Sequence, residues 1–378
     1  MATYNGSNGD DTLAGNIDYD QYNLGEGNNN VKDLIGSNTF NAGSGNDSVE
    51  SGGGNDTFNL GEGRNIIKDS GGNNNVNTGS GADDITTGDG DDQVNAGEGA
   101  NVINAGAGTN RVNTGSGADR ITTGNGNDEI NAGEGNNWID AGAGANRVTA
   151  GSGNDNITTG DGNDDIFAGE GSNTINAGGG INHIYTGSGT DKITVGVGDH
   201  QIYSGGGADD ISISGGKALV YAGEGNDIVR VVADGVYKEL WGEGGSDILE
   251  LTLTAAQAKD PSVIADINGF KANKDWTYTF KSLNITARQF EKIVIKAPVE
   301  GADDSATTDE DHSVVINVLS NDVDLLADGK ALHVAGVTQP AGGSVSVSPD
   351  GKTVSFDPGS AFQHLTLAST QMSRLPTR

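Results

Sequence analysis

The chain has no cysteine, little proline, few aromatic side chains and few basic side chains. Its 378 residues include no Cys, 6 Pro, 3 Trp, 8 Tyr and 8 Phe, and 21 Lys and Arg stand against 53 Asp and Glu, for a net charge of −32. The absence of Cys excludes a disulfide framework and Cys-based zinc sites. The negative charge argues against nucleic acids and anionic membranes as partners and favours metal cations instead.

Other expected signals are missing as well. The first residues, MATYNGSNGDDTLAGN, contain neither the basic nor the apolar part of a secretory signal, and no run approaches a transmembrane helix. We also find no HExxH, GxSxG, Walker A or Cys–His arrangement, and the five His are scattered. We therefore expect no membrane span and no catalytic residues, so the chain is predicted not to be an enzyme.

Glycine, by contrast, is abundant and periodic. From Leu24 to Arg230 the sequence divides into 23 nonapeptides without insertion or deletion. The fourth position is always Gly, the second is Gly in all but three units, and the eighth is Val or Ile except at Phe40 and Phe58. Low hydrophobic content and high charge are typical of disorder, but a disordered chain does not keep such a register. The repeat therefore indicates a solenoid.

Each nonapeptide has two parts. Positions seven to nine are predicted to form a short strand whose middle, β-branched side chain points inward. Positions one to six are predicted to form a turn in which Gly allows positive φ and close backbone approach. Two units then make one 18-residue coil with two parallel sheets. The core is only two aliphatic rows, so further interactions must hold the turns together.

The sixth position supplies a candidate for these interactions. It is often Asp, in a turn where glycine frees backbone carbonyls, and oxygens in flexible geometry are what Ca²⁺ prefers. Capping of tight turns by Asp is the alternative explanation. The candidate calcium ligands are Asp11, Asp47, Asp56, Asp83, Asp92, Asp119, Asp128, Asp155, Asp164, Asp191, Asp209 and Asp227.

The units resemble the hemolysin-type calcium-binding (RTX) repeats, G-G-x-G-x-D-x-U-x, over about residues 5 to 230. This resemblance implies a roll that folds on Ca²⁺ outside the bacterial cell, often after type I secretion. We therefore expect an all-β fold, with a right-handed parallel β-roll over residues 1–230, a β-rich cap over 231–299 and a partial β-sandwich module over 300–378.

Ten sixth positions depart from the family pattern, because they are Asn. They come in pairs that alternate with Asp pairs, which gives a 36-residue super-repeat. An Asn amide offers one oxygen, and its NH₂ group cannot ligate a cation. We therefore hypothesise about half the calcium of an all-Asp roll, with Asn amides bonded to turn backbones. Near the C-terminal end of the roll, His200 and Ala218 replace a ligand. The Asn positions are 29, 38, 65, 74, 101, 110, 137, 146, 173 and 182.

The remaining segments have a different composition. Aromatic residues and the alternating LELTLT and FEKIVIK strings predict the cap, with an aromatic ligand pocket as the less favoured reading. DEDHSVVINVLSNDVD resembles the start of cadherin-like or Ig-like repeats of bacterial surface proteins. Asp322 and Asp324 are candidates for a junction calcium site, although exposed acidic turn residues are the commoner explanation. The last residues do not continue the strand pattern, so we expect this chain to be part of a longer exported protein.

These features predict a calcium-binding module of a secreted or cell-surface protein, exported by a type I-like route. Its partners are predicted to be Ca²⁺ and cell-surface or extracellular glycans or proteins. Two other functions stay open: the non-catalytic part of an exported protease, lipase or epimerase, and an ice- or glycan-binding roll. Thr and Asn at ninth positions favour ice binding, but Phe167, Tyr185 and Tyr203 interrupt that row.

Overall fold

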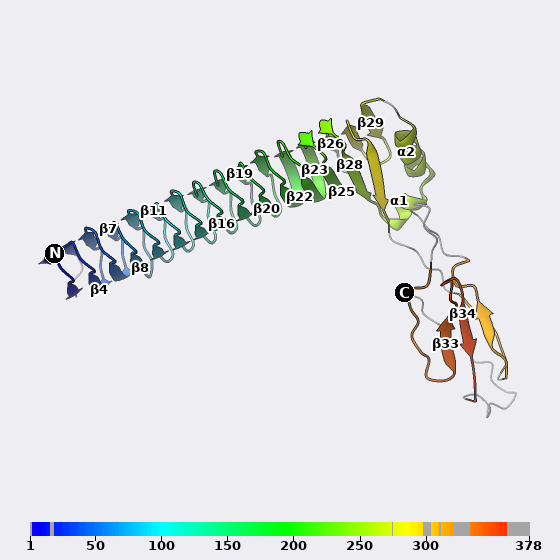
Figure 1. Ribbon diagram of the computed structural model, residues 1–378, viewed down its shortest axis with the longest axis horizontal. Helices are drawn as coiled ribbons and strands as arrows, with labels where there is room; N and C mark the ends of the chain where they lie inside the picture. Colours follow the sequence, from blue (N-terminus) through cyan, green and yellow to red (C-terminus); the bar gives the residue numbers. More distant parts are fainter. Residues whose placement is uncertain are drawn as a thin grey trace. The chain divides into compact units, whose positions relative to one another are not determined.

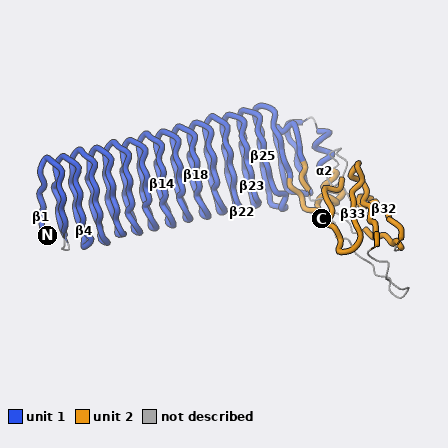
Figure 2. Tube along the Cα trace, turned by 60° about the horizontal axis from the view of Figure 1, so that its bottom comes forward, with its two compact units in different colours: residues 1–251, 266–294 blue, residues 252–265, 295–378 orange. Residues whose placement is uncertain are grey.

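The computed structural model describes residues 2–15, 19–273, 275–297, 304–309, 311–320 and 333–360. Residues 1–251 and 266–294 form one compact unit, and residues 252–265 and 295–378 form a second (Figure 2). The first unit is a parallel solenoid whose coils follow one another along the chain (Figure 1). The predicted all-β class and the parallel solenoid are therefore confirmed.

Two stacks of parallel strands form the walls of the solenoid. Sheet A contains β2 Thr12–Ala14, β4 Asn30–Ile35, β6 Ser48–Gly53, β8 Ile66–Lys68, β10 Asp84–Thr86, β12 Val102–Asn104, β14 Arg120–Thr122, β16 Trp138–Asp140, β18 Asn156–Thr158 and β20 Thr174–Asn176. Sheet B contains β1 Ala2–Asn5, β3 Asp20–Gly25, β5 Thr39–Ala42, β7 Thr57–Gly61, β9 Asn75–Thr78, β11 Gln93–Gly97, β13 Arg111–Thr114, β15 Glu129–Asn131, β17 Arg147–Thr149, β19 Asp165–Gly169 and β21 His183–Thr186.

The register is 18 residues in both sheets. Ile103 pairs with Ile121 in sheet A, and Val112 pairs with Ile130 in sheet B. Two long strands, β22 Lys192–Tyr203 and β23 Asp210–Tyr221, then run through both sheets and pair with each other in the same register. The predicted coil of two nonapeptides is thus the repeating unit of the structure.

The eighth-position side chains of the two sheets form the main rows of the core, and first-position residues such as Leu24, Leu60 and Ala96 are buried beside them. From Val31 to Val229 the eighth-position side chains are essentially inaccessible to solvent, and most are Ile or Val, as a pleated, crowded interior favours. In the first coils of sheet B this row is aromatic: the rings of Tyr22, Phe40 and Phe58 stack at centroid distances of 5.0 and 5.1 Å. The interior is apolar but narrow, so the coils also depend on contacts between the turns.

Parallel pairing continues beyond Arg230, with one coil lengthened to 20 residues, since Ala218 pairs with Lys238. The further strands are β24 Glu224–Gly225, β25 Ile228–Val232, β26 Lys238–Trp241, β27 Gly244–Gly245, β28 Ile248–Thr252, β29 Thr277–Phe280, β30 Ile285–Arg288 and β31 Lys292–Lys296. β30 extends sheet B in parallel beside β26, and β29 pairs antiparallel with β30. Two helices, α1 Ala255–Lys259 and α2 Pro261–Ala272, interrupt the strands. The sequence reading did not predict them.

The described part of the second unit contains a small antiparallel sheet, in the order β32 Val314–Ile316, β34 Val354–Asp357, β33 Ser344–Val347. Val318, Val345 and Val354 form its buried core. Asp322 and Asp324, the candidate junction ligands, lie outside the described residues.

Adjacent glycines test how strictly the turn requires its conformation. Gly54 has φ 143°, and a Cβ built there lies 2.2 Å from the Gly36 carbonyl oxygen of the preceding coil, whereas a Cβ on Gly53 meets nothing within 4 Å. We expect Gly54→Ala to lower the free energy of unfolding by about 1–3 kcal/mol or more. Gly53→Ala should change it by no more than about 0.5 kcal/mol. Chemical unfolding at fixed calcium measures both, and equal effects would contradict the close approach of the coils.

Candidate calcium sites

The sixth-position side chains form two columns, one along each edge of the roll. Column A precedes the strands of sheet A, and column B precedes those of sheet B. Column A contains Asp11, Asn29, Asp47, Asn65, Asp83, Asn101, Asp119, Asn137, Asp155, Asn173, Asp191, Asp209, Asp227 and Asp247. Column B contains Asp20, Asn38, Asp56, Asn74, Asp92, Asn110, Asp128, Asn146, Asp164, Asn182, His200, Ala218 and Lys238. Apart from the first-coil Asp11, every member is buried.

A single hydrogen-bond rule connects the coils along each column. The backbone N–H of one sixth residue donates to Oδ1 of the sixth residue in the next coil, whether that residue is Asp or Asn. In column A, Asn65 donates to Asp83 at 2.7 Å and Asp83 donates to Asn101 at 3.0 Å. In column B, Asn110 donates to Asp128 at 2.7 Å. Asp and Asn side chains are therefore oriented alike, and the two residue types differ at their second terminal atom.

In the Asn turns this second atom is an NH₂ group with acceptors close by. Nδ2 of Asn65 donates to the carbonyl oxygens of Gly61 at 3.1 Å and Gly63 at 3.2 Å, which occupy the second and fourth positions of its own turn. Nδ2 of Asn137 also donates to the Ala150 carbonyl of the next coil, at 3.3 Å. The amide is surrounded by carbonyl oxygens from two coils and satisfies them, as the sequence hypothesis expected for the Asn turns.

In the Asp turns the same place holds a carboxylate oxygen, which cannot donate to those carbonyls. The Oδ2 atoms of most predicted ligands are buried and have no hydrogen-bond partner in the described structure: Asp47, Asp83, Asp119, Asp128, Asp155, Asp164, Asp191, Asp209 and Asp227. A carboxylate oxygen among carbonyl oxygens is an unfavourable cluster unless a cation joins them, and Ca²⁺ accepts six to eight such ligands. The donor set therefore fits calcium.

Backbone oxygens must supply most of the ligands. Within the described ranges, no three His, Cys, Asp or Glu side chains gather into a group that could hold a metal. Each Asp turn instead contributes one carboxylate and several carbonyls, which matches the mixed ligand sets that Ca²⁺ tolerates.

Burial also changes the acidity of these carboxylates. Burial raises the pKa of Asp92, Asp155 and Asp209 to about 6, although the hydrogen bonds that these carboxylates accept act to lower it. It raises the pKa of Asp227 to about 7, with a smaller contribution from the neighbouring charges of Asp209 and Asp247. A raised pKa means that the negative charge is poorly compensated by the chain itself.

Three predicted ligands have partners within the chain. Asp56 and Asp92 accept hydrogen bonds on Oδ2 from Ser51 and Thr87, each at 2.6 Å. Asp11, in the less buried first coil, accepts from the backbone N–H of Ser7 at 2.7 Å. These turns therefore offer a carboxylate that already has one donor.

The hydroxyl partners reveal a signal in the sequence that the repeat reading missed. The first position of the nonapeptide is Thr or Ser in eight of the eleven Asp units, and Ala or Leu in eight of the ten Asn units. On both edges a hydroxyl can also donate to a carbonyl of the next coil, as Thr114 does to Ala132 at 2.6 Å and Thr123 to Ala141 at 3.3 Å. First and sixth positions thus vary together because their side chains meet inside the turn.

Two column members, Asp20 and Asp247, and Glu291 beside column A were not predicted as ligands. Asp20 falls outside the 23-unit register, and Asp247 follows the 20-residue coil. Glu291 lies immediately before β31, and its Oε2 accepts the N–H of Asp247 at 2.6 Å. The Oδ2 atoms of Asp20 and Asp247 are buried and have no hydrogen-bond partner among the described residues, as in most of the predicted ligands. Column B instead ends in His200, Ala218 and Lys238, which confirms that it loses its carboxylates near the cap.

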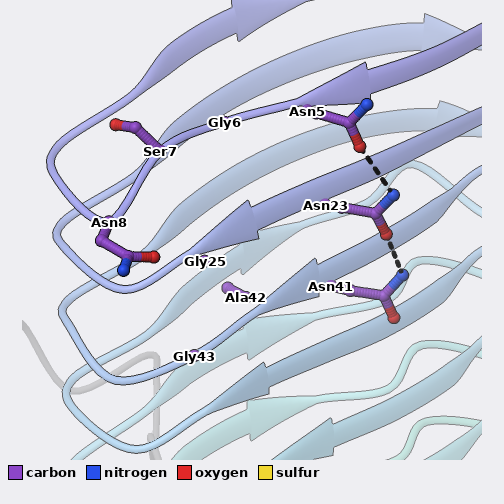
Figure 3. Close-up of a pocket in the computed structure, with 9 residues that line it drawn as sticks. All are labelled: Asn5, Gly6, Ser7, Asn8, Asn23, Gly25, Asn41, Ala42 and Gly43. Atoms are coloured by element: carbon purple, nitrogen blue, oxygen red, sulfur yellow. Dashed lines mark hydrogen bonds between the residues drawn. The ribbon is translucent and has the colours of Figure 1, made fainter.

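The outer face of sheet B is laddered as well. Asn5, Asn23 and Asn41 form a side-chain chain of hydrogen bonds, each Nδ2 donating to the Oδ1 of the preceding coil at 3.1 Å (Figure 3). The same row continues to Asn113 and later becomes aromatic, with Phe167, Tyr185, Tyr203, Tyr221 and Trp241 stacked at 4.9 to 5.6 Å. Each Asn amide bonds to the amide of a neighbouring coil, and each ring stacks on the ring of a neighbouring coil. This outer row therefore joins the coils of sheet B to one another.

Comparison with protein families agrees with this geometry. Residues 34–67, 69–139 and 140–211 match the RTX calcium-binding nonapeptide repeat, and residues 296–371 match the bacterial Ig domain. Both resemblances drawn from the sequence are thereby confirmed, and the chain carries calcium-binding RTX repeats together with an Ig-type module. A search of curated proteins returned no significant match. Of the helices described, neither is long and apolar enough to cross a membrane.

The raised pKa values predict how the calcium-free chain responds to pH. Because protonated Asp is favoured in the folded state, stability is highest below the ordinary Asp range and is lost as pH rises through the folded pKa values of about 6 and 7. We expect thermal unfolding in chelator to show a falling midpoint between about pH 4 and 7. Asp227→Asn should flatten this fall, and a midpoint that rises over the same window would contradict it.

Proposed function

We propose that this chain is a calcium-stabilised structural and interaction module of a secreted or cell-surface bacterial protein. The matches to RTX repeats and to a bacterial Ig domain support the proposal that the chain lies outside the cell, where Ca²⁺ is available to the turns. Export by a type I-like route and the absence of catalysis belong to the same proposal.

One observation carries the proposal: the contrast between Asp and Asn turns. Both side chains are buried and bonded alike through Oδ1, but the Asn65 amide satisfies nearby carbonyls whereas the Asp83 Oδ2 has no partner in the described structure. Ion binding to the folded state stabilises it by mass action. Calcium therefore serves the fold, because it joins oxygens of consecutive turns that the chain leaves uncompensated.

Calcium removal tests the function directly. We expect circular dichroism of the full chain to lose parallel-sheet signal, or its thermal midpoint to fall by many degrees, when chelator replaces Ca²⁺. Magnesium should not restore it, because Mg²⁺ demands a smaller octahedral site. A spectrum and midpoint unaffected by chelator would remove calcium from the proposed function.

The alternation of Asp and Asn predicts the stoichiometry. Calorimetric titration should count about half the ions of a roll with Asp in every turn, because Asn amides already satisfy their carbonyls. One tight ion for every inter-coil turn would show that Asn turns also bind calcium and would refute the hypothesis.

A matched pair of isosteric exchanges separates charge from shape. Asp119→Asn places an amide where neighbouring turns already accommodate one, so in chelator it should raise the free energy of unfolding by about 1–3 kcal/mol. The further increase in the free energy of unfolding when Ca²⁺ is added should be smaller in this variant than in the wild type. Asn101→Asp, one coil away in column A, should do the reverse. If the two exchanges change calcium-free stability in the same direction, the turns do not distinguish carboxylate from amide as argued.

A further inference from the structure

The strongest run of carboxylates lies where the repeat ends. In column A, Asp191, Asp209, Asp227 and Asp247 follow one another without an intervening Asn, and each N–H donates to the next Oδ1 at 2.8 Å. Asp247 then donates to Oε2 of Glu291. Glu291 stands immediately before β31, so the column passes from the roll into the cap.

The last step has the features of a built site. Asp247 is fully buried, and its Oδ2 has no hydrogen-bond partner among the described residues. A Cβ built on Gly242 lies 2.4 Å from the Gln289 carbonyl oxygen and 2.5 Å from Asp247 Oδ2, so both oxygens face the same space, which only a glycine leaves open. The Gln289 carbonyl and the buried Asp247 carboxylate therefore lie beside one space, and the exposed Glu291 contacts the backbone of the same Asp247.

The backbone around this place is held in an uncommon conformation. Of the described non-glycine residues only three have positive φ, and two of them, Glu243 at 71° and Gln289 at 57°, flank the space. Nε2 of Gln289 donates to the Glu243 carbonyl at 3.3 Å, which ties the two segments together. Such conformations cost about 1–3 kcal/mol each and persist where the surrounding structure fixes them. Here they flank Gly242, beside which the Gln289 carbonyl and Asp247 Oδ2 both lie.

The opposite edge of the same coil shows how the chain avoids a metal. Lys238 occupies the column B position, is fully buried, and places Nζ 2.5 Å from Asp234 Oδ1. The ammonium group also donates to the Val236 carbonyl at 3.4 Å, two residues back, as Asn amides do in their turns. Edge B therefore has its own cation at this level, whereas the buried Oδ2 of Asp247 on edge A has no hydrogen-bond partner among the described residues.

We propose that Asp247, Glu291 and the Gln289 carbonyl bind a calcium ion that joins the last coil to the cap strand β31. This inference rests on the proposed calcium loading of the roll, but its site lies beyond the repeat and takes ligands from outside it. The Asp227 carboxylate, also buried and unpartnered at Oδ2 among the described residues, lies one coil earlier in the same column. Calcium then fixes the cap as well as the turns.

The test compares the full chain with Glu291→Gln and Asp247→Asn. We expect each variant to bind one calcium ion fewer by calorimetry, since Asn turns show that an amide is tolerated in the column. Hydrogen exchange in wild type should slow with Ca²⁺ both in roll strands and in peptides covering residues 289–294. In both variants the roll response should remain, and the response of residues 289–294 should be lost.

Glu129→Gln is the matched control, because it removes the same charge from an exposed ion pair with Arg111 far along the roll. It should leave the ion count and the exchange of residues 289–294 unchanged. Wild-type ion counts in both junction variants, or exchange at 289–294 that ignores calcium while roll strands respond, would overturn the junction site alone. A wild-type chain in which roll strands also ignore calcium would overturn the proposed function together with it.

Discussion

The structure depends on what fills the centre of each glycine turn. In most Asn turns, carbonyl oxygens of the turn itself accept from the sixth-position amide, as Gly61 and Gly63 do from Asn65. Buried oxygens gathered in this way need a hydrogen-bond donor or a cation. The chain uses an amide in the Asn turns and an ammonium group at Lys238, and its Asp turns present the ligand set of a calcium ion. The two aliphatic rows of the core exclude water but do not fix the turns.

Toward the C-terminal end of the roll, the two edges differ in the groups that fill their turns. Column A becomes a continuous series of carboxylates, whereas column B passes to His200, Ala218 and Lys238. Over these same coils the outer row of sheet B is the stacked series from Phe167 to Trp241, with Arg288 over Trp241 at 4.4 Å. Ring stacking contributes about 0.5–1.5 kcal/mol per pair beyond burial. Packing therefore supports the edge that has no carboxylates, and calcium is available to the edge that has them.

Periodicity alone made the fold readable from the sequence. The eighth-position row and the constant fourth glycine predict the 18-residue coil, because only a stacked solenoid buries every such residue. The Asp and Asn columns follow from the same register. Helices α1 and α2 lie outside the repeat, and the Thr254–Gln257 capping box at α1 is a short, local signal that the strand-like strings around it obscured. Glu291 was unpredictable for another reason: it joins column A only through the tertiary pairing that follows a 20-residue coil, and nonapeptide spacing carries no trace of that contact.

The central claim is that an Asn amide occupies, in its turns, the place that calcium takes in the Asp turns. A crystal structure of the calcium-loaded chain, with anomalous scattering used to locate the ions, measures this most directly. The account predicts anomalous peaks beside the Oδ2 atoms of residues such as Asp83 and Asp119, and none beside the Nδ2 atoms of Asn65 and Asn101. Peaks of equal height in Asn and Asp turns, or no peaks beside the buried carboxylates, would contradict it.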